Sequence, residues 1–356
     1  MGMTDRELHQ IRRFVETVLE AETLPACIQP DFLREAVLSY PHRPGKSLRP
    51  ALLVWCCELV GGERAHCARA AAAIELQHNW TLIHDDIIDR DDTRRGGPSC
   101  HRLIEQSTEF EVADPAARAE CAKDQAMLAG DILHAWAVNL LGRCTADGVP
   151  PAVALALVGR MSGMVTPLLV SGESLDVQFE HQRADVTAER VLAMLRLKTA
   201  VLLRFAAEAG VAIGLKTADF THETIQSAGR FAESAGLAFQ IQDDILGLFG
   251  DEARLKKPVG SDVRAGKPTL LHLAALEGAN QEDARELRSA FGDPSLSPEQ
   301  LERVRAIVQD CGALEQVRSL ATRQLENARE ILAGFPESPA RARLESWTTQ
   351  LMTRRH

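Results

Sequence analysis

Two clusters of aspartates are the first residues in this chain whose types and spacing could do chemistry. The first lies in LIHDDIIDRDDTRRGG (82–97), where five aspartates directly follow an apolar helical stretch. The second is QDDILGLFGD (242–251), with Asp243 and Asp244 again at the end of an apolar stretch. Neighbouring carboxylates repel one another, and the negative end of a helix dipole disfavours them further. Each cluster therefore needs a cationic partner.

The spacing of the first cluster indicates what that partner is. In a helix, Asp85 and Asp89 share a face, Asp86 lies about 100° round, and His78 lies two turns earlier on the same side. A solvated acidic helix end is the default interpretation of one such cluster. An EF-hand calcium loop is excluded because its glycine and bidentate glutamate are missing. Mg²⁺ takes few carboxylates and completes its shell with water and substrate phosphates, so the repeated pair favours a multi-metal site with a phosphate ligand.

Basic residues stand where a phosphate ligand would need them. Each alone would be an ordinary surface charge, but Lys198 interrupts an otherwise apolar helix in AMLRLKTAVLL, where a charge needs a partner. The other candidates follow the two acidic clusters or lie in PGKSLRP: Arg94, Arg95, Lys257, Lys267, Lys46 and Arg49.

The composition excludes several functional classes. The 356 residues carry a net charge of −10 with no basic tail, so we expect no nucleic-acid partner. The eight cysteines include no C-x-x-C pair, which is typical of reduced thiols. The charged N-terminus lacks the apolar segment of a secretory signal, and no run approaches the roughly 20 apolar residues of a membrane span. We expect a cytoplasmic protein without a transmembrane segment.

Helical periodicity dominates the elements that must position these residues. Hydrophobic residues make up 45% of the chain and aromatic residues only 4%, a balance that favours helices over strands. We predict helices over 5–22, 30–39, 48–60, 64–90, 118–143, 150–171, 187–213, 221–249, 267–278, 283–291, 297–312, 314–334 and 338–354. No linker separates them, so residues 1–356 are expected to form one all-α domain. The least patterned stretch, 105–120, is expected to be an exposed loop or a poorly ordered insertion.

Seven motifs, in order along the chain, resemble the trans-isoprenyl diphosphate synthases, the family of farnesyl and geranylgeranyl diphosphate synthases. They are GKSLRP (45–50), LQHNWTLIHDDIIDRDDTRRGGP (76–98), LAGDIL (128–133), GESLD (172–176), LKTA (197–200), FQIQDDILGLFGD (239–251) and KPVGSDVRAGKPTLL (257–271). The resemblance implies a bundle of roughly ten or more helices around a central apolar cavity. It also implies a homodimer and a prenyltransferase that joins an allylic diphosphate to isopentenyl diphosphate.

The resemblance assigns roles to the charged residues. About three Mg²⁺ ions would hold the departing diphosphate, with Asp85, Asp89 and Asp243 as ligands and Asp86 and Asp244 in support. The allylic diphosphate would be bound by Arg94, Lys198, Lys257 and Lys267. Isopentenyl diphosphate would be bound, without metal, by Lys46, Arg49, His78 and Arg95. Thr199 and Gln240 would face the allylic cation. The catalytic set would thus be Lys198, Thr199, Gln240, Asp85 and Asp243.

The chain departs from the family pattern in four places. Gly247 stands where many relatives have a third aspartate, which puts the strength of metal binding there in doubt. Glu173 replaces a glutamine, and Lys256 replaces a glycine. Between His101 and Gly130 the chain has about ten extra residues, in a region that lies near the dimer interface in the family.

The resemblance also bears on product length. Trp80, five residues before Asp85, matches the position where a bulky ring stops chain elongation in the family, and Thr81 and Gln77 lie nearby. A buried tryptophan is usually only part of a core. We expect C15 to C20 products, with geranylgeranyl diphosphate favoured over farnesyl diphosphate because Thr81 is small.

Two other functions stay open. A class I terpene cyclase shares the fold and one aspartate motif, but its second metal motif is not found here. A non-catalytic partner subunit commonly lacks an aspartate motif, whereas both are present in this chain.

Overall fold

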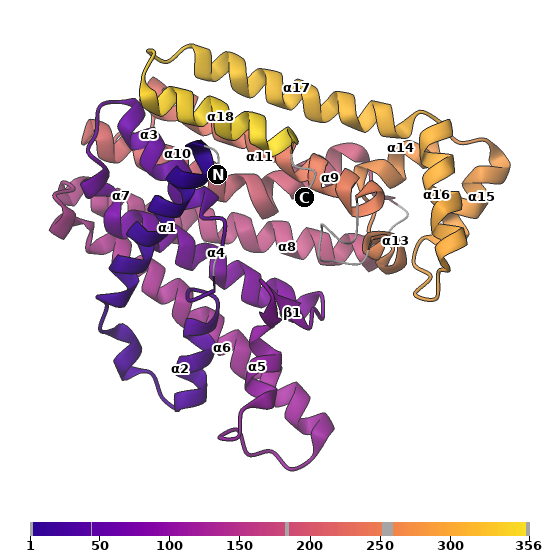
Figure 1. Cartoon of the computed structure of the whole chain (residues 1–356), viewed down its shortest axis with the longest axis horizontal. Helices are drawn as coiled ribbons and strands as arrows, with labels where there is room; N and C mark the ends of the chain where they lie inside the picture. The colour runs from indigo at the N-terminus through magenta and orange to yellow at the C-terminus, as the bar shows by residue number, and fades with distance from the viewer. Residues whose placement is uncertain (1–2, 44, 182–184, 251–258, 354–356) are drawn as a thin grey trace. The chain divides into compact units, whose positions relative to one another are not determined.

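The computed structural model describes residues 3–43, 45–181, 185–250 and 259–353, and helices dominate it (Figure 1). The all-α prediction is confirmed. The longer α-helices are α1 (Met3–Glu20), α2 (Asp31–Ser39), α3 (Leu48–Leu59), α4 (Ala68–Ile88), α6 (Pro115–Gly142), α7 (Pro151–Arg160), α8 (Thr166–His181), α9 (Ala188–Leu195), α10 (Val201–Leu215), α11 (Glu223–Phe249), α14 (Leu270–Gly278), α15 (Gln281–Ala290), α16 (Pro298–Asp310), α17 (Ala313–Ala333) and α18 (Pro339–Thr353).

Each predicted helix has a counterpart, but short elements were missed. The helices α5 (Cys100–Gln106) and α13 (Ser261–Ala265) span two turns or fewer, too few for an apolar period to show. Strands β1 (Thr93–Arg94) and β2 (Gly97–Pro98) form a minimal antiparallel hairpin. Five-residue π-helical segments, Met161–Val165 and Arg196–Ala200, connect α7 to α8 and α9 to α10.

The chain divides into two compact units, each drawn from several stretches of sequence. Unit 1 comprises Met1–Pro167, Phe205–Gly229 and Ser338–Arg343, and unit 2 comprises Leu168–Arg204, Arg230–Glu337 and Leu344–His356. The expectation of a single domain over 1–356 stays a prediction.

In unit 1 the central pair of helices is α4 and α6, which run side by side (Figure 1). Small residues let them approach closely: Ala70 to Ala73 on α4 and Ala122, Ala126 and Ala129 on α6 are all fully buried. Helices α1 and α3 pack on α4, and α2 and α5 pack on α6. Both aspartates of the DD pair at 85–86 therefore project from the end of a helix that the core holds rigidly.

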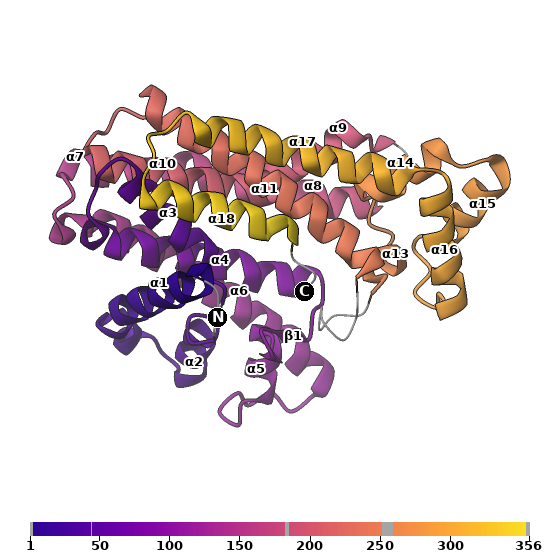
Figure 2. The same ribbon diagram turned by 45° about the horizontal axis from the view of Figure 1, so that its top comes forward.

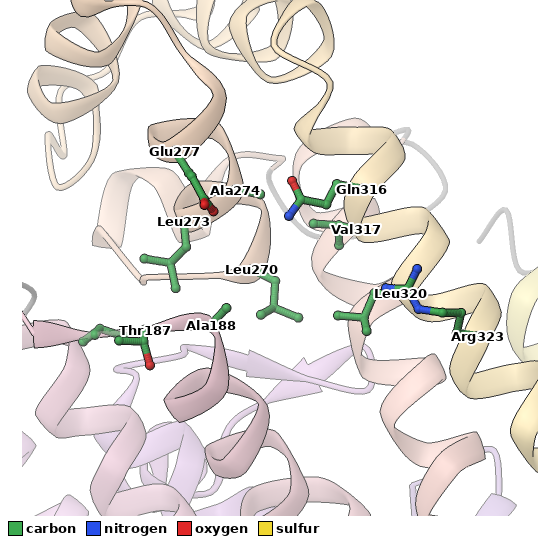
Figure 3. A pocket seen from close by; sticks show the side chains of 11 residues that line it. Thr187, Ala188, Leu270, Leu273, Ala274, Glu277, Gln316, Val317, Leu320 and Arg323 are labelled. Carbon is green, nitrogen blue, oxygen red and sulfur yellow. The ribbon is translucent and has the colours of Figure 1, made fainter.

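In unit 2, α17 packs along α14, while α16 contacts α14, α15 and α17 (Figure 2). A capping box fixes the start of α16, because Ser297 and Gln300 exchange hydrogen bonds between side chain and backbone. A pocket of about 340 Å³ opens between α9, α14 and α17, lined chiefly by apolar side chains with Glu277 and Arg323 at its edge (Figure 3). It contains none of the predicted site residues.

The helical run Pro151–His181 corrects one expectation about apolar segments. By length and composition it is apolar enough to cross a membrane, and 33% of its most apolar window is buried. A core helix can pass the same test, so a single such run is weak grounds for a membrane span. The prediction of a helix ending near residue 171 was also too short, since α8 continues to His181.

The unpatterned stretch 105–120 has a defined structure. The Arg118 guanidinium donates to the carbonyl oxygens of Glu105 (2.7 Å), Ser107 (2.5 Å) and Phe110. The Phe110 ring packs against Phe32 of α2, with ring centroids 5.3 Å apart. The half-buried Arg118 side chain therefore ties residues 105–110 to α6, which begins at Pro115, earlier than predicted.

Candidate active site

The first aspartate motif occupies the last turn of α4. Asp85 lies within the helix with 20% of its side chain exposed, and Asp89 is the exposed residue that ends it. The Asp89 N–H donates to the Asp85 carbonyl oxygen at 2.8 Å, which keeps the two residues on one helical face as predicted. Carboxylates at this end of a helix oppose its dipole, so the arrangement favours a bound cation.

Asp86 points into the protein instead. Its side chain is fully buried, and it accepts hydrogen bonds from Arg94 (Nε, 2.7 Å) and from the Tyr40 hydroxyl. Burial raises the pKa of Asp86, although Arg94 and Tyr40 act in the opposite direction. Both carboxylate oxygens already accept hydrogen bonds from the protein. This geometry favours an indirect role for Asp86, in which it positions neighbouring side chains, over direct metal ligation.

In the hairpin after α4, the neighbouring residues Arg94 and Arg95 contact different partners. Arg95 and Gly96 form its turn, both with positive φ (52° and 76°), a conformation that costs energy at a non-glycine residue. Arg94 contacts Asp86, Asp91 (3.1 Å) and Asp85 (3.7 Å). Arg95 contacts Glu75 (3.3 Å) and the Tyr40 carbonyl oxygen (3.1 Å).

Arg95 belongs to a cluster in unit 1 with the Arg49 guanidinium and the His78 imidazole. Burial lowers the pKa of Arg49 to about 10, with nearby Glu75 opposing that change. Burial also lowers the pKa of His78, and Arg49, Arg95 and Arg94 add to the effect. Within the described residues, Arg49 Nε and His78 Nδ1 are buried without a hydrogen-bond partner. The buried Arg49 Nε–H, close to the Arg95 guanidinium, fits an anionic ligand that needs no metal.

The GKSLRP motif brings this cluster together. Ser47 adopts a left-handed conformation (φ 48°) immediately before α3, and Lys46 beside it is exposed. Gly45 leaves room for Arg95, since a Cβ at this position would lie 2.9 Å from Arg95 Cζ and the guanidinium would have to shift.

In unit 2, Lys198 and Thr199 lie on the π-helical segment Arg196–Ala200, a rare geometry that is frequent at functional sites. Lys198 Nζ lies 2.7 Å from Asp176 and 2.9 Å from Glu173. The charge of Lys198 is thus balanced by two carboxylates on α8, as a charge on an apolar helix requires. Gly172 permits the approach, since a Cβ there would lie 2.3 Å from the Lys198 backbone nitrogen.

Lys267 joins the same acidic face of α8. Its Nζ lies 3.2 Å from Glu180 and 3.9 Å from Asp176. Lys198 and Lys267 are therefore brought together, as predicted for residues that bind one diphosphate. Lys257 and the neighbouring Lys256 lie outside the described residues.

A hydrogen-bonded chain connects the π-helical segment to the second aspartate motif. The Thr199 hydroxyl donates to Gln240 Oε1 (3.2 Å), and Gln240 Nε2 donates to Asp244 (3.5 Å). Burial raises the pKa of Asp244 well above its ordinary value, and Asp262, Asp243 and Asp176 add repulsion. Asp243 itself is exposed. Such crowding of carboxylates fits a divalent cation.

Gly247 has an acidic neighbour. A Cβ at this position would lie 3.1 Å from an Asp262 carboxylate oxygen, and the Gly260 N–H donates to the Gly247 carbonyl at 2.9 Å. Asp262 therefore supplies negative charge where the motif lacks its third aspartate. The sequence contained it, within the motif VGSDVRAGKP, but nothing in the spacing indicated this proximity.

The residue set fits Mg²⁺ in the presence of a diphosphate. Over the described ranges, no group of three or more His, Cys, Asp or Glu side chains is arranged to hold a metal ion unaided. Mg²⁺ commonly uses one or two carboxylates and takes its remaining ligands from phosphates and water. Asp85, Asp89 and Asp243 offer such hard oxygen donors.

The predicted chain-length residues lie on α4 in unit 1. Trp80 is 6% exposed, and its ring packs against the rings of His84 and His134. Thr81 donates to the His78 carbonyl oxygen (2.8 Å), and Gln77 donates to Thr166 (3.2 Å). Sequence reasoning missed Tyr40, Glu75 and His134, whose positions become informative only once the helices pack.

With this geometry in place, comparison with known proteins is decisive. The family model described as polyprenyl synthetase matches residues 30–309.

The chain belongs to the polyprenyl synthetase family.

Similar polyprenyl synthetases include several archaeal enzymes. The geranylgeranyl diphosphate synthase of Saccharolobus solfataricus is 34% identical over 304 residues, covering 84% of each chain. A short chain isoprenyl diphosphate synthase of Methanothermobacter thermautotrophicus is 36% identical over 331 residues, covering 92% of each chain. The solved structure of geranylgeranyl pyrophosphate synthetase from Pyrococcus horikoshii superposes with a TM-score of 0.84 at 30% identity, covering 99% of this chain and 100% of that one. This polyprenyl synthetase is accordingly a prenyltransferase of the isoprenyl diphosphate synthase class, as the resemblance implied.

Proposed function

We propose that this enzyme condenses an allylic diphosphate with isopentenyl diphosphate to give an all-trans C15 to C20 prenyl diphosphate, with geranylgeranyl diphosphate as the favoured product. One observation carries the proposal: the chain builds two chemically different anion sites. Arg49 and Arg95 lie near His78, and within the described residues Arg49 Nε and His78 Nδ1 are buried without a hydrogen-bond partner. Lys198 and Lys267 instead lie among carboxylates that suit a metal-bound diphosphate.

The two sites suit substrates of different reactivity. The allylic C–O bond ionises, so its diphosphate must accumulate negative charge, and preorganised cations lower that barrier. Lys198 and Lys267, with Arg94 and Lys257, are the groups proposed to hold it. Isopentenyl diphosphate must not ionise, which is why Lys46, Arg49, His78 and Arg95 would bind it without metal.

We assign the Mg²⁺ ligands to Asp85, Asp89 and Asp243, with Asp86 and Asp244 in support, and expect about three ions per active site. When bound, Mg²⁺ would neutralise charge on the diphosphate oxygens and fix their orientation. Asp86 would act indirectly, since it holds Arg94 at 2.7 Å.

Thr199 and Gln240 are proposed to face the allylic cation. Gln240 Oε1 accepts a hydrogen bond from the Thr199 hydroxyl (3.2 Å), which fixes the direction of the amide dipole. The isopentenyl double bond then attacks the cation, a carbon–carbon bond forms, and a proton leaves the adjacent carbon. The departing pyrophosphate is the proposed acceptor, so no protein base is needed.

The product length rests on Trp80 and on relatives that differ in product. Similar enzymes are named for geranylgeranyl diphosphate in Saccharolobus solfataricus and for farnesyl diphosphate in Geobacillus stearothermophilus, at 34% and 32% identity. We favour the C20 product because Thr81, beside Trp80, is small. Farnesyl diphosphate is the alternative.

The test is a product assay on the purified protein with Mg²⁺, isopentenyl diphosphate and each allylic primer, followed by dephosphorylation and chromatography. A C20 alcohol is expected, and a C15 alcohol would favour the alternative. Hydrocarbon formed from the allylic diphosphate alone would point to a terpene cyclase. Turnover only after addition of a second protein would point to a partner subunit.

We also propose a homodimer located in the cytoplasm. On unit 1, α6 exposes Met127 and Leu128 (49% each) and α7 exposes Leu155 (73%), side chains that would lose unfavourable contact with water in an interface. A second copy would cover them. Light scattering during size-exclusion chromatography should give twice the chain mass, and a monomer mass would contradict the proposal.

A further inference from the structure

Trp80 is held between two imidazole rings. The His134 ring centroid lies 5.1 Å from that of Trp80 with the planes tilted by 39°, and the His84 ring lies 5.5 Å away at 65°. These are favourable separations for aromatic pairs. The Trp80 indole Nε1 is buried and has no hydrogen-bond partner within the described part of the chain. Ring contacts, and not a polar anchor, therefore set the orientation of the indole.

His134 is itself anchored to a neighbouring helix. Its Nδ1 lies 2.8 Å from Gln77 Oε1, and Gln77 Nε2 donates to the Thr166 hydroxyl at 3.2 Å. Because this amide donates through nitrogen, its oxygen accepts, and His134 must carry its proton on Nδ1. Burial lowers the pKa of His134, which favours the neutral imidazole, and in that form the bond to Gln77 fixes the tautomer. Thr166, Gln77, His134 and Trp80 thus form one continuous chain of contacts.

Gly130 on α6 makes this packing possible. A Cβ at this position would lie 2.3 Å from His84 Nε2 and 3.3 Å from Trp80 Cδ1. His134 follows one helical turn later on α6, which runs beside α4 (Figure 1). The close approach of the two helices is therefore what brings the His134 ring onto the indole.

We propose that His134 is a specificity-determining residue, which sets prenyl chain length by fixing the orientation of the Trp80 indole. It is a positioning residue, because it acts through Trp80 and not on the reacting atoms. The inference rests on the proposed function, in which the indole limits elongation of an isoprenoid chain. Neither the aspartate motifs nor the basic clusters include this residue.

Two variants separate the ring of His134 from its hydrogen bond. His134→Asn keeps a donor toward Gln77 but removes the ring, whereas His134→Phe keeps a ring and removes the donor. With Mg²⁺, farnesyl diphosphate and isopentenyl diphosphate, His134→Asn should raise the share of products longer than the wild-type product about fivefold. His134→Phe should stay nearer to the wild-type distribution. His101→Asn, at a buried histidine of the same unit that lies on α5, is the matched control and should leave the distribution unchanged.

A double variant tests whether His134 acts through Trp80. Trp80→Ala should lengthen the products, and Trp80→Ala combined with His134→Asn should give the same distribution as Trp80→Ala alone, because the ring then has nothing to position. Additive shifts, or a lengthening in Trp80→Ala with none in His134→Asn, would overturn the inference. Unchanged products in both variants would overturn it as well, by removing Trp80 from the gate. Wild-type protein that forms no prenyl diphosphate would instead refute the proposed function, so the two failures are distinguishable.

Discussion

The Tyr40 hydroxyl donates a hydrogen bond to the buried Asp86 carboxylate, although the two residues lie 46 positions apart in the sequence. The backbone N–H of Cys100 donates to the same hydroxyl at 3.1 Å. Burial raises the pKa of Tyr40, so the hydroxyl stays protonated and remains a donor. Tyr40 thereby ties the end of α2 and the start of α5 to the aspartate motif.

Tyr40→Phe should destabilise the protein. The variant leaves Asp86 with one fewer donor inside the core, which costs about 1–3 kcal/mol for a buried polar group. Urea denaturation should show a lower free energy of unfolding, and kcat should fall because Asp86, which holds Arg94, is then fixed less firmly. Unchanged stability would mean that Arg94 alone satisfies Asp86. Phe32→Leu, which alters packing but no hydrogen bond, is the comparison for a general packing effect.

Asp85→Ala and Asp243→Ala should each lower kcat by about three orders of magnitude or more, because each removes a proposed metal ligand from a site that stabilises developing charge. Raising the Mg²⁺ concentration should restore part of the activity. Steady-state kinetics with circular dichroism as a folding check measures both effects. Asp124→Ala, an exposed aspartate on α6, is the control. Near-normal turnover in both variants would contradict the mechanism.

Glu173→Gln should strengthen binding of the allylic diphosphate. Glu173 holds Lys198 Nζ at 2.9 Å and therefore competes with the substrate for it. Because both side chains are partly exposed, the pair is worth little, and KM should fall by about threefold with kcat nearly unchanged. Initial-rate measurements with each substrate varied in turn test this. An equal change in the KM for isopentenyl diphosphate would contradict the assignment of Lys198.

Asp244 should make the stability of the metal-free protein depend on pH. Its pKa is raised in the folded state, so the folded protein holds this proton more tightly than the unfolded chain does. Protonated Asp244 therefore contributes to the free energy of unfolding below the ordinary carboxyl pKa of about 4. This contribution is lost as the pH rises through the raised pKa of Asp244 in the folded protein.

Thermal unfolding in EDTA across this pH range, with Asp244→Asn as the comparison, provides the measurement. The variant should gain stability relative to the wild type as the pH rises, because it never carries the repelled charge. Parallel pH profiles for the two proteins would rule out this role for Asp244.

Local sequence patterns were enough to predict the longer helices, the family and the candidate residues. Apolar periodicity is a local property, so helices such as α4 and α17 could be predicted nearly to their ends. The aspartate motifs and LKTA are also contiguous in sequence, which is why Asp85, Asp243 and Lys198 could be named without coordinates.

The partners of these residues could be read only from the folded chain. Asp85 and Asp86 are adjacent in sequence, yet one stays partly exposed and the other is buried against Tyr40, because successive helical residues point about 100° apart. Several contacts join residues of different elements: Glu173 with Lys198, Asp262 with Gly247 and His134 with Trp80. Such contacts depend on how closely two helices approach, and glycines such as Gly130 and Gly172 reveal that distance only after the chain has folded.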